Sequence, residues 1–143
     1  MGKVLMAVDE TVGSTSVLSV YKTMVRDPES VVLIHVQRLE DTSMQTEKIM
    51  DFYKQELESV GPVRVTVLVR DGVPSEEILK AAREEAVDLI IMGRSNKSAF
   101  QRLVAGCVTK EVERAATVPV LVAKTGGCEK SITYGLRGES YAA

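Results

Sequence analysis

The chain has 143 residues, 45% of them hydrophobic and 27% charged, which is the balance of one soluble globular domain. The net charge of −2 and the absence of tryptophan argue against a nucleic-acid surface. One histidine, and two cysteines without zinc-site spacing, argue against a metal centre. No apolar run reaches the length of about 20 residues that a membrane helix needs. Without a signal-peptide pattern, a cytoplasmic location is expected.

Five short apolar runs, rich in valine, isoleucine and leucine, divide the chain. They cover residues 3–8, 31–36, 63–69, 88–92 and 119–123. Most of these runs are continuous rather than alternating, which predicts strands that are buried on both faces.

The segments between the runs carry apolar residues at helical spacing. The four stripes are Val17, Val20, Tyr21, Met24 and Val25; Ile49, Met50, Tyr53, Leu57 and Val60; Ile78, Leu79, Ala82 and Ala86; and Val104, Val108, Val112 and Ala115. Pro74 and Ser75, followed by two glutamates, are typical of a helix start. The alternation predicts an α/β fold, with a parallel sheet covered by helices on both faces.

Ligands of such sheets bind beyond the carboxyl ends of the strands, where the strand order reverses. This rule directs attention to the residues after the first and fourth runs, from Asp9 and from Gly93 onward. The segment 92–109 runs from a strand to a helix and contains Gly93 and Gly106. Small residues there would let backbone N–H groups approach a polyphosphate, whereas the same glycines also suit ordinary turns.

Residues 125–143 contain four glycines and little periodic apolar content. This composition predicts a flexible tail after a domain of residues 1–124. The alternative is an arm ordered against a partner subunit through Ile132, Tyr134 and Leu136.

The loop resembles the G-x2-G-x9-G-[ST] motif of the universal stress protein family, with Gly93, Asn96 and Gly106 at the glycine positions. Other segments, in the family's order, are similar to it as well; they are residues 4–9, 33–36, 72–82, 88–93 and 118–122. The resemblance covers about residues 3–124. It implies a single-domain, three-layer α/β/α fold of the adenine nucleotide alpha hydrolase-like type, with a five-stranded parallel sheet in the order 3-2-1-4-5.

The ATP-binding members of that family suggest roles for matching positions. Asp9 would bind the ribose, while Val36 and Met92 would border the adenine. The remaining positions would surround the ribose and phosphates of ATP or AMP, which could bind together with Mg²⁺. These positions are Gly93, Arg94, Asn96, Gly106, Cys107, Val108 and Thr109. Lys97 and Arg102 are further candidates for phosphate contacts. For Asp9 a turn or helix cap is the alternative role, and for Val36 and Met92 it is core packing.

Two positions depart from the motif. Asn96 replaces a glycine, although asparagine tolerates left-handed backbone better than other residues. Cys107 replaces serine or threonine, so a weak thiol donor stands where a hydroxyl is usual. A thiol at a helix start can also be reactive, which suggests redox control of the site as a further hypothesis. His35 lies within a strand and is expected to be packed and hydrogen-bonded.

Three functions remain open. The first is a dimeric module for stress regulation that binds adenine nucleotide, and the second is a nucleotide-free regulatory protein of the same fold. The third is an enzyme of a related nucleotide-binding group; the sequence shows no catalytic constellation, so at most weak ATP hydrolysis is expected. The resemblance implies a homodimer that pairs through strand 119–124, whose valines would otherwise form an exposed apolar edge.

Overall fold

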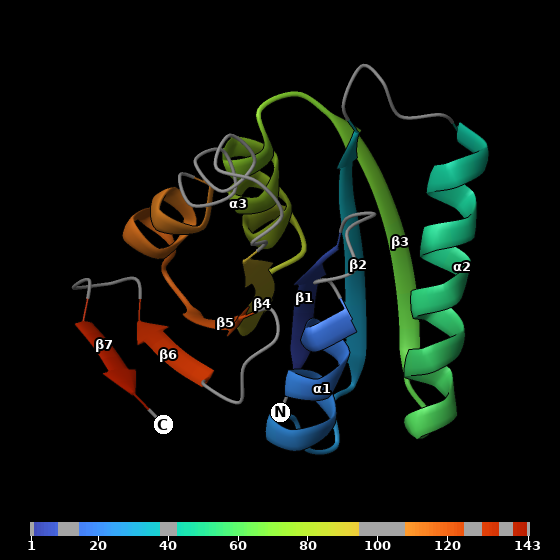
Figure 1. Cartoon of the computed structure of the whole chain (residues 1–143), viewed down its shortest axis with the longest axis horizontal. Helices are drawn as coiled ribbons and strands as arrows, with labels where there is room; N and C mark the ends of the chain where they lie inside the picture. Colours follow the sequence, from blue (N-terminus) through green and yellow to red (C-terminus); the bar gives the residue numbers. More distant parts are fainter. Residues whose placement is uncertain are drawn as a thin grey trace.

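A computed structural model describes residues 2–8, 15–37, 43–94, 108–124, 130–134 and 139–142. The elements in chain order are β1 (Lys3–Ala7), α1 (Thr15–Met24), β2 (Ser30–Gln37), α2 (Ser43–Val60), β3 (Arg64–Asp71), α3 (Pro74–Glu84), β4 (Leu89–Arg94), β5 (Pro119–Lys124), β6 (Lys130–Tyr134) and β7 (Glu139–Ala142). A further helix, drawn without a label in Figure 1, covers residues 108–115.

The strands form one sheet in the order β3-β2-β1-β4-β5-β6-β7 (Figure 1). The first five strands are parallel, and β1 is paired on both sides, with Val4 beside Val31 of β2 and Leu89 of β4. The predicted parallel sheet and its order 3-2-1-4-5 are therefore confirmed. The strand order reverses between β1 and β4, which makes this the switch point where ligands bind in such folds.

Two antiparallel strands, β6 and β7, extend the sheet beyond β5. The sequence predicted five strands, followed by a flexible tail or by an arm ordered against a partner subunit. The register places Pro119 beside Tyr134 and Ala123 beside Lys130, so β6 uses backbone groups that β5 would otherwise leave unpaired. Mixed polar and apolar residues between glycines give a weak strand signal, so periodicity did not reveal β6 and β7. The division of the chain at residue 124 stays a prediction.

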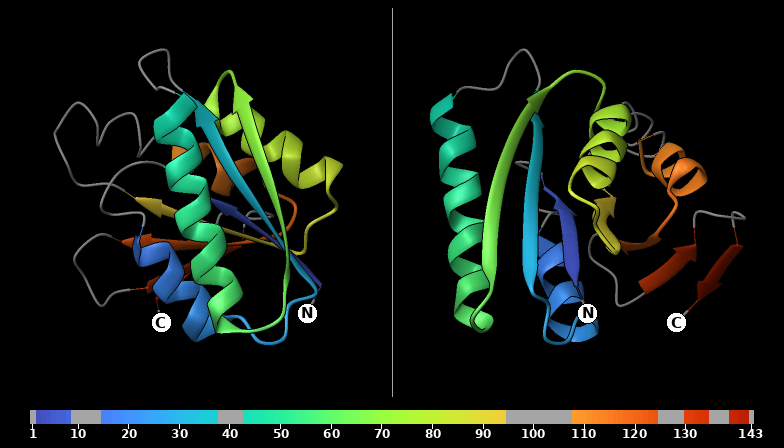
Figure 2. Two further views of the ribbon diagram at one scale, coloured as in Figure 1. Left: turned by 90° about the vertical axis from the view of Figure 1, so that its right-hand side faces the viewer. Right: turned by 180° about the vertical axis from the view of Figure 1, so that it is seen from behind.

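Each of the five parallel strands, β1 to β5, sends side chains into two apolar layers. One layer lies under α1 and α2 and contains Val4, Met6, Val31, Leu33 and Ile91 together with Tyr21 and Leu57 of the helices. The other lies under α3 and the helix 108–115 and contains Leu5, Val32, Ile34, Ile90 and Val120 together with Ile78 and Val112. Figure 2 shows these helices on the two faces of the sheet. The three-layer prediction is thus confirmed.

The helix α3 ends in a Schellman motif with an unusual residue. The N–H of Val87 donates to the carbonyl of Ala82 (3.1 Å), and that of Ala86 donates to the carbonyl of Arg83 (3.2 Å). Ala86 has φ 51°, a left-handed conformation that glycine usually occupies at this position. The methyl group of Ala86 therefore strains the turn that leads into β4.

Replacing this alanine with glycine should stabilise the protein. Because Ala86 is exposed, little packing is lost in Ala86→Gly, and removal of the left-handed strain should raise the free energy of unfolding by about 1 kcal/mol. Urea denaturation measures this change. Ala82→Gly, within the same helix, is the matched control and should lower the free energy of unfolding by about 1 kcal/mol. Equal destabilisation by both substitutions would contradict the strain at Ala86.

Candidate functional site

The carboxyl ends of β1, β2 and β4 form the predicted ligand edge. Ala7, the last residue of β1, lies beside Ile34 of β2 and Met92 of β4. The chain after β1 continues along this edge, because the N–H of Val8 donates to the carbonyl of Ile34 at 2.9 Å. Asp9 follows directly and lies outside the described residues.

Four segments at this edge contribute apolar side chains to the core cluster under α3. Met92 is buried in the cluster under α3, and Ala7, Val36 and Val108 pack against the same cluster. Val36 and Met92 come from the strands on either side of β1. Three of the predicted site residues, Val36, Met92 and Val108, therefore contribute to one core cluster on this face of the sheet.

The other predicted site residues divide into described and undescribed positions. Gly93 pairs with Ala123 of β5, and Thr109 is fully buried at the start of the helix 108–115. Arg94 is the last residue of β4, and only its backbone belongs to the described part of the chain. Outside the described residues lie Asp9, Asn96, Lys97, Arg102, Gly106 and Cys107.

His35 supports this edge from the opposite face of the sheet. It is only 3% exposed, and its Nδ1 lies 3.0 Å from the carbonyl oxygen of Val8. A carbonyl can only accept, so Nδ1 carries the proton in this contact. The prediction that His35 is packed and hydrogen-bonded is confirmed. No pattern in the sequence indicated that its hydrogen-bond partner is Val8, the residue just before Asp9.

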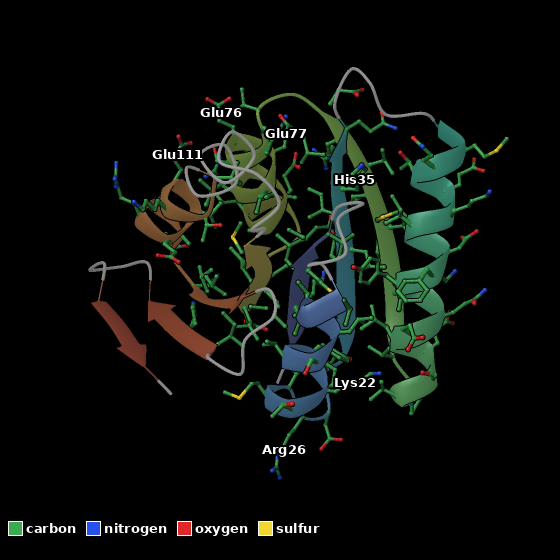
Figure 3. All side chains as sticks on the ribbon, viewed as in Figure 1. Lys22, Arg26, His35, Glu76, Glu77 and Glu111 are labelled. Carbon is green, nitrogen blue, oxygen red and sulfur yellow. The ribbon has the colours of Figure 1, made fainter. Side chains whose placement is uncertain are left out.

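The helices α3 and 108–115 are joined near the same edge. The buried Ser75 donates its hydroxyl hydrogen to the carboxylate of Glu111. Figure 3 shows Glu76, Glu77 and Glu111 in this corner. Arg70 of β3 balances part of this negative charge, with its guanidinium 3.8 Å from Glu77 and 3.1 Å from Glu84. The contact of Ser75 with Glu111 fixes the helix that follows the glycine loop against α3.

A small cavity of about 250 Å³ lies at the other end of the sheet. Its lining includes Val87 and Val118, which precede β4 and β5, together with Leu79, Ala82 and Arg83 of α3. It is therefore remote from the ligand edge. Across the described ranges, no cluster of three or more acidic, histidine or cysteine side chains could hold a metal, and no helix is long and apolar enough to cross a membrane.

Loss of the His35 contact should weaken the structure. In His35→Leu the carbonyl of Val8 loses a buried donor, which should lower the free energy of unfolding by about 1–3 kcal/mol. His35→Gln, which keeps an N–H donor, is the control and should lose less. Urea denaturation of the three proteins measures the difference. A leucine variant as stable as the parent would show that this hydrogen bond does not hold the edge.

Comparisons with known proteins agree with this architecture. The model of the universal stress protein family matches residues 1–124. Universal stress protein MJ0577 of Methanocaldococcus jannaschii is 43% identical over 75 residues, which cover 52% of this chain and 46% of the relative. Thus the matched region spans about half of that relative. Universal stress protein C of Escherichia coli O157:H7 is 34% identical over 107 residues, which cover 73% of each protein.

Solved structures share the fold over most of the chain. The solved structure of MJ0577 has a TM-score of 0.72 and 30% identity, and the match covers 88% of this chain and 97% of that one. Two others are universal stress proteins, one in complex with cAMP (TM-score 0.69, 17% identity, covering 87% and 98%) and one from Arabidopsis thaliana with AMP bound (0.65, 16%, covering 89% and 94%). At these lower identities the likeness shows the fold alone. The family match and the shared fold together establish that the chain belongs to the universal stress protein family.

Proposed function

We propose that this protein binds an adenine nucleotide, ATP or AMP, at the carboxyl edge between β1 and β4. The observation that carries the proposal is that Val36 and Met92 come from the strands on either side of β1, at the switch point, and share one apolar cluster with Val108. An apolar surface of this kind suits a planar base, and the switch point is where parallel sheets bind nucleotides.

The remaining contacts follow from positions around that cluster. Asp9 would hydrogen-bond the ribose, because it comes directly after the anchored Val8. The phosphates would lie against the loop from Gly93 to Thr109, including Arg94, Asn96, Gly106 and Cys107. The helix 108–115 begins at the end of this loop, and the positive end of its dipole favours an anion. A Mg²⁺ ion would bind at this site together with the nucleotide phosphates.

Relatives support this ligand class. Universal stress proteins with the same fold are bound to cAMP and to AMP, and one from Archaeoglobus fulgidus is in complex with dAMP. All three ligands carry an adenine base. The proposed site has no assigned catalytic residue, so binding with at most weak ATP hydrolysis is proposed rather than an efficient enzyme.

The proposed module acts in the cytoplasm as a homodimer in stress regulation. The nucleotide would act by binding one state of the dimer, or of a complex with a protein partner, more tightly than another. Strand 119–124, which is β5, is the interface implied by the resemblance. β6 pairs with that edge of β5 over five residues, so β6 must leave before a partner's β5 can pair there.

The second candidate is a nucleotide-free regulatory protein of the same fold. Two sequence features favour it, the side chain of Asn96 in the phosphate loop and the thiol of Cys107 in place of a hydroxyl. A calorimetric test separates the two candidates.

Protein purified without added nucleotide should release an adenine nucleotide on denaturation, detected by mass spectrometry, or should bind ATP or AMP with micromolar affinity. Gly106→Trp should abolish this binding by filling the phosphate loop. Gly61→Trp is the control, because a side chain at Gly61 meets open space at the other end of β3, and it should bind as the parent does. Absence of released ligand and of binding heat at millimolar nucleotide would favour the nucleotide-free protein.

Restoring the hydroxyl should strengthen binding. A hydrogen bond to a charged group contributes about 1.5–3 kcal/mol, so Cys107→Ser should increase nucleotide affinity by about ten- to hundredfold. The other cysteine supplies the control, because Cys128→Ser should leave the affinity unchanged. Titration calorimetry measures all three proteins. An unchanged affinity in Cys107→Ser would mean that position 107 contributes only its backbone N–H.

A further inference from the structure

Glu111, on the helix 108–115, extends its side chain to α3. Its carboxylate accepts the hydroxyl hydrogen of Ser75, which is the second residue of α3 and is only 2% exposed. Across the described part of the chain, this carboxylate has no other hydrogen bond or ion pair. The two helices are held together near the contact, because Ile78 and Val112 belong to one buried cluster. The position of the Glu111 charge therefore depends on a single hydroxyl group.

The start of α3 both attracts and repels the Glu111 carboxylate. The positive end of a helix dipole stabilises negative charge in the first turn. Val73 occupies the N-cap position of α3, and a valine side chain has no atom that could cap the helix. However, Glu76 and Glu77 already lie in the first turn, and Figure 3 shows them in the same corner as Glu111. Because their charges repel Glu111, the hydroxyl of Ser75 is needed to hold its carboxylate there.

The other position open to this carboxylate is over the start of its own helix. Side chains on a helix lean towards its N-terminus, and residues three apart lie on the same face. Glu111 comes three residues after Val108, with which the described helix begins. Val108 is one of the positions that the proposed function places beside the ribose and phosphates. A carboxylate over this turn would repel the phosphates and would compete with them for the positive end of the dipole.

We propose that Ser75 and Glu111 determine how well the nucleotide site accepts phosphate charge. The hydroxyl of Ser75 holds the Glu111 carboxylate against α3, which leaves the start of the helix 108–115 to the phosphates. Both are positioning residues, because their effect on the ligand is electrostatic and requires no contact with it. The inference rests on the proposed adenine nucleotide site and adds a specificity to it. Loss of the Ser75 contact weakens binding more strongly as the number of phosphates on the ligand increases.

An electrostatic effect can be distinguished from a packing defect. Repulsion between Glu111 and the ligand grows with the charge of the phosphates, and dissolved salt screens it. Adenosine has no phosphate and would use the same apolar surface for its base. A distorted helix would therefore weaken the binding of adenosine as well, whereas a displaced carboxylate would not.

Titration calorimetry of the full chain with ATP, AMP and adenosine tests the proposal. Ser75→Ala should weaken ATP binding about fivefold and AMP binding about twofold, which is the size expected for one charge near a helix N-terminus. The affinity for adenosine should not change. Both losses should become smaller at high salt, because the repulsion is then screened.

Removal of the Glu111 charge should reverse the loss. Glu111→Gln should bind ATP at least as tightly as the parent does. The double variant Ser75→Ala, Glu111→Gln should bind ATP as Glu111→Gln does, because no carboxylate remains to be released. Glu58→Gln is the matched control, since it makes the same change in net charge on an exposed position of α2, on the other face of the sheet. Combined with Ser75→Ala, it should leave the loss of ATP affinity in place.

The outcomes separate this inference from the proposed function. Equal losses for ATP, AMP and adenosine in Ser75→Ala would overturn the inference and leave nucleotide binding intact. So would a loss of ATP affinity that Glu111→Gln does not reverse, or an unchanged ATP affinity in Ser75→Ala. A parent that binds none of the three ligands would overturn the proposed function, and this inference with it.

Discussion

β1 is hydrogen-bonded to a parallel strand on each side, and the rest of the structure depends on this central position. Val4, Leu5 and Met6 are fully buried, so both faces of β1 need a covering layer. α1 and α2 supply one layer, and α3 with the helix 108–115 supplies the other. Because all strands beside β1 run in the same direction, their carboxyl ends meet at one edge, and the strand order reverses there. The place of the candidate site thus follows from the packing of the core.

His35 connects that core to the candidate site. Its ring is buried under the sheet, while its Nδ1–H is donated to the carbonyl of Val8, at the point where the chain leaves β1. On the other face, Met92 belongs to the core cluster, and Val36 and Val108 pack against it. The proposed adenine surface is therefore an extension of the core rather than a separate loop structure. Side chains that already pack in the core need less ordering when a ligand binds, which lowers the entropic cost of binding.

The two outer edges of the sheet differ in whether the backbone groups of the edge have hydrogen-bond partners. At one edge β6 pairs with β5, and β7 pairs with β6, so the backbone groups of β5 find partners within the chain. At the other edge, β3 pairs only with β2 among the described strands, and its Val67 and Val69 are exposed. A dimer through β5 would require the departure of β6.

The sequence by itself determined the alternation of strands and helices, the two buried faces and the strand-to-helix loop that begins at Gly93, because residue periodicity reports burial locally. The resemblance carried by that loop added the strand order. Only the tertiary structure decided that His35 bonds to Val8, that Ala86 adopts a left-handed turn, and that β6 and β7 extend the sheet. The site divides in the same way, since the family resemblance singled out Val36, Met92 and Val108 but did not show that they share one core cluster. Pairing between distant segments depends on how the whole core packs, and no local pattern encodes that information.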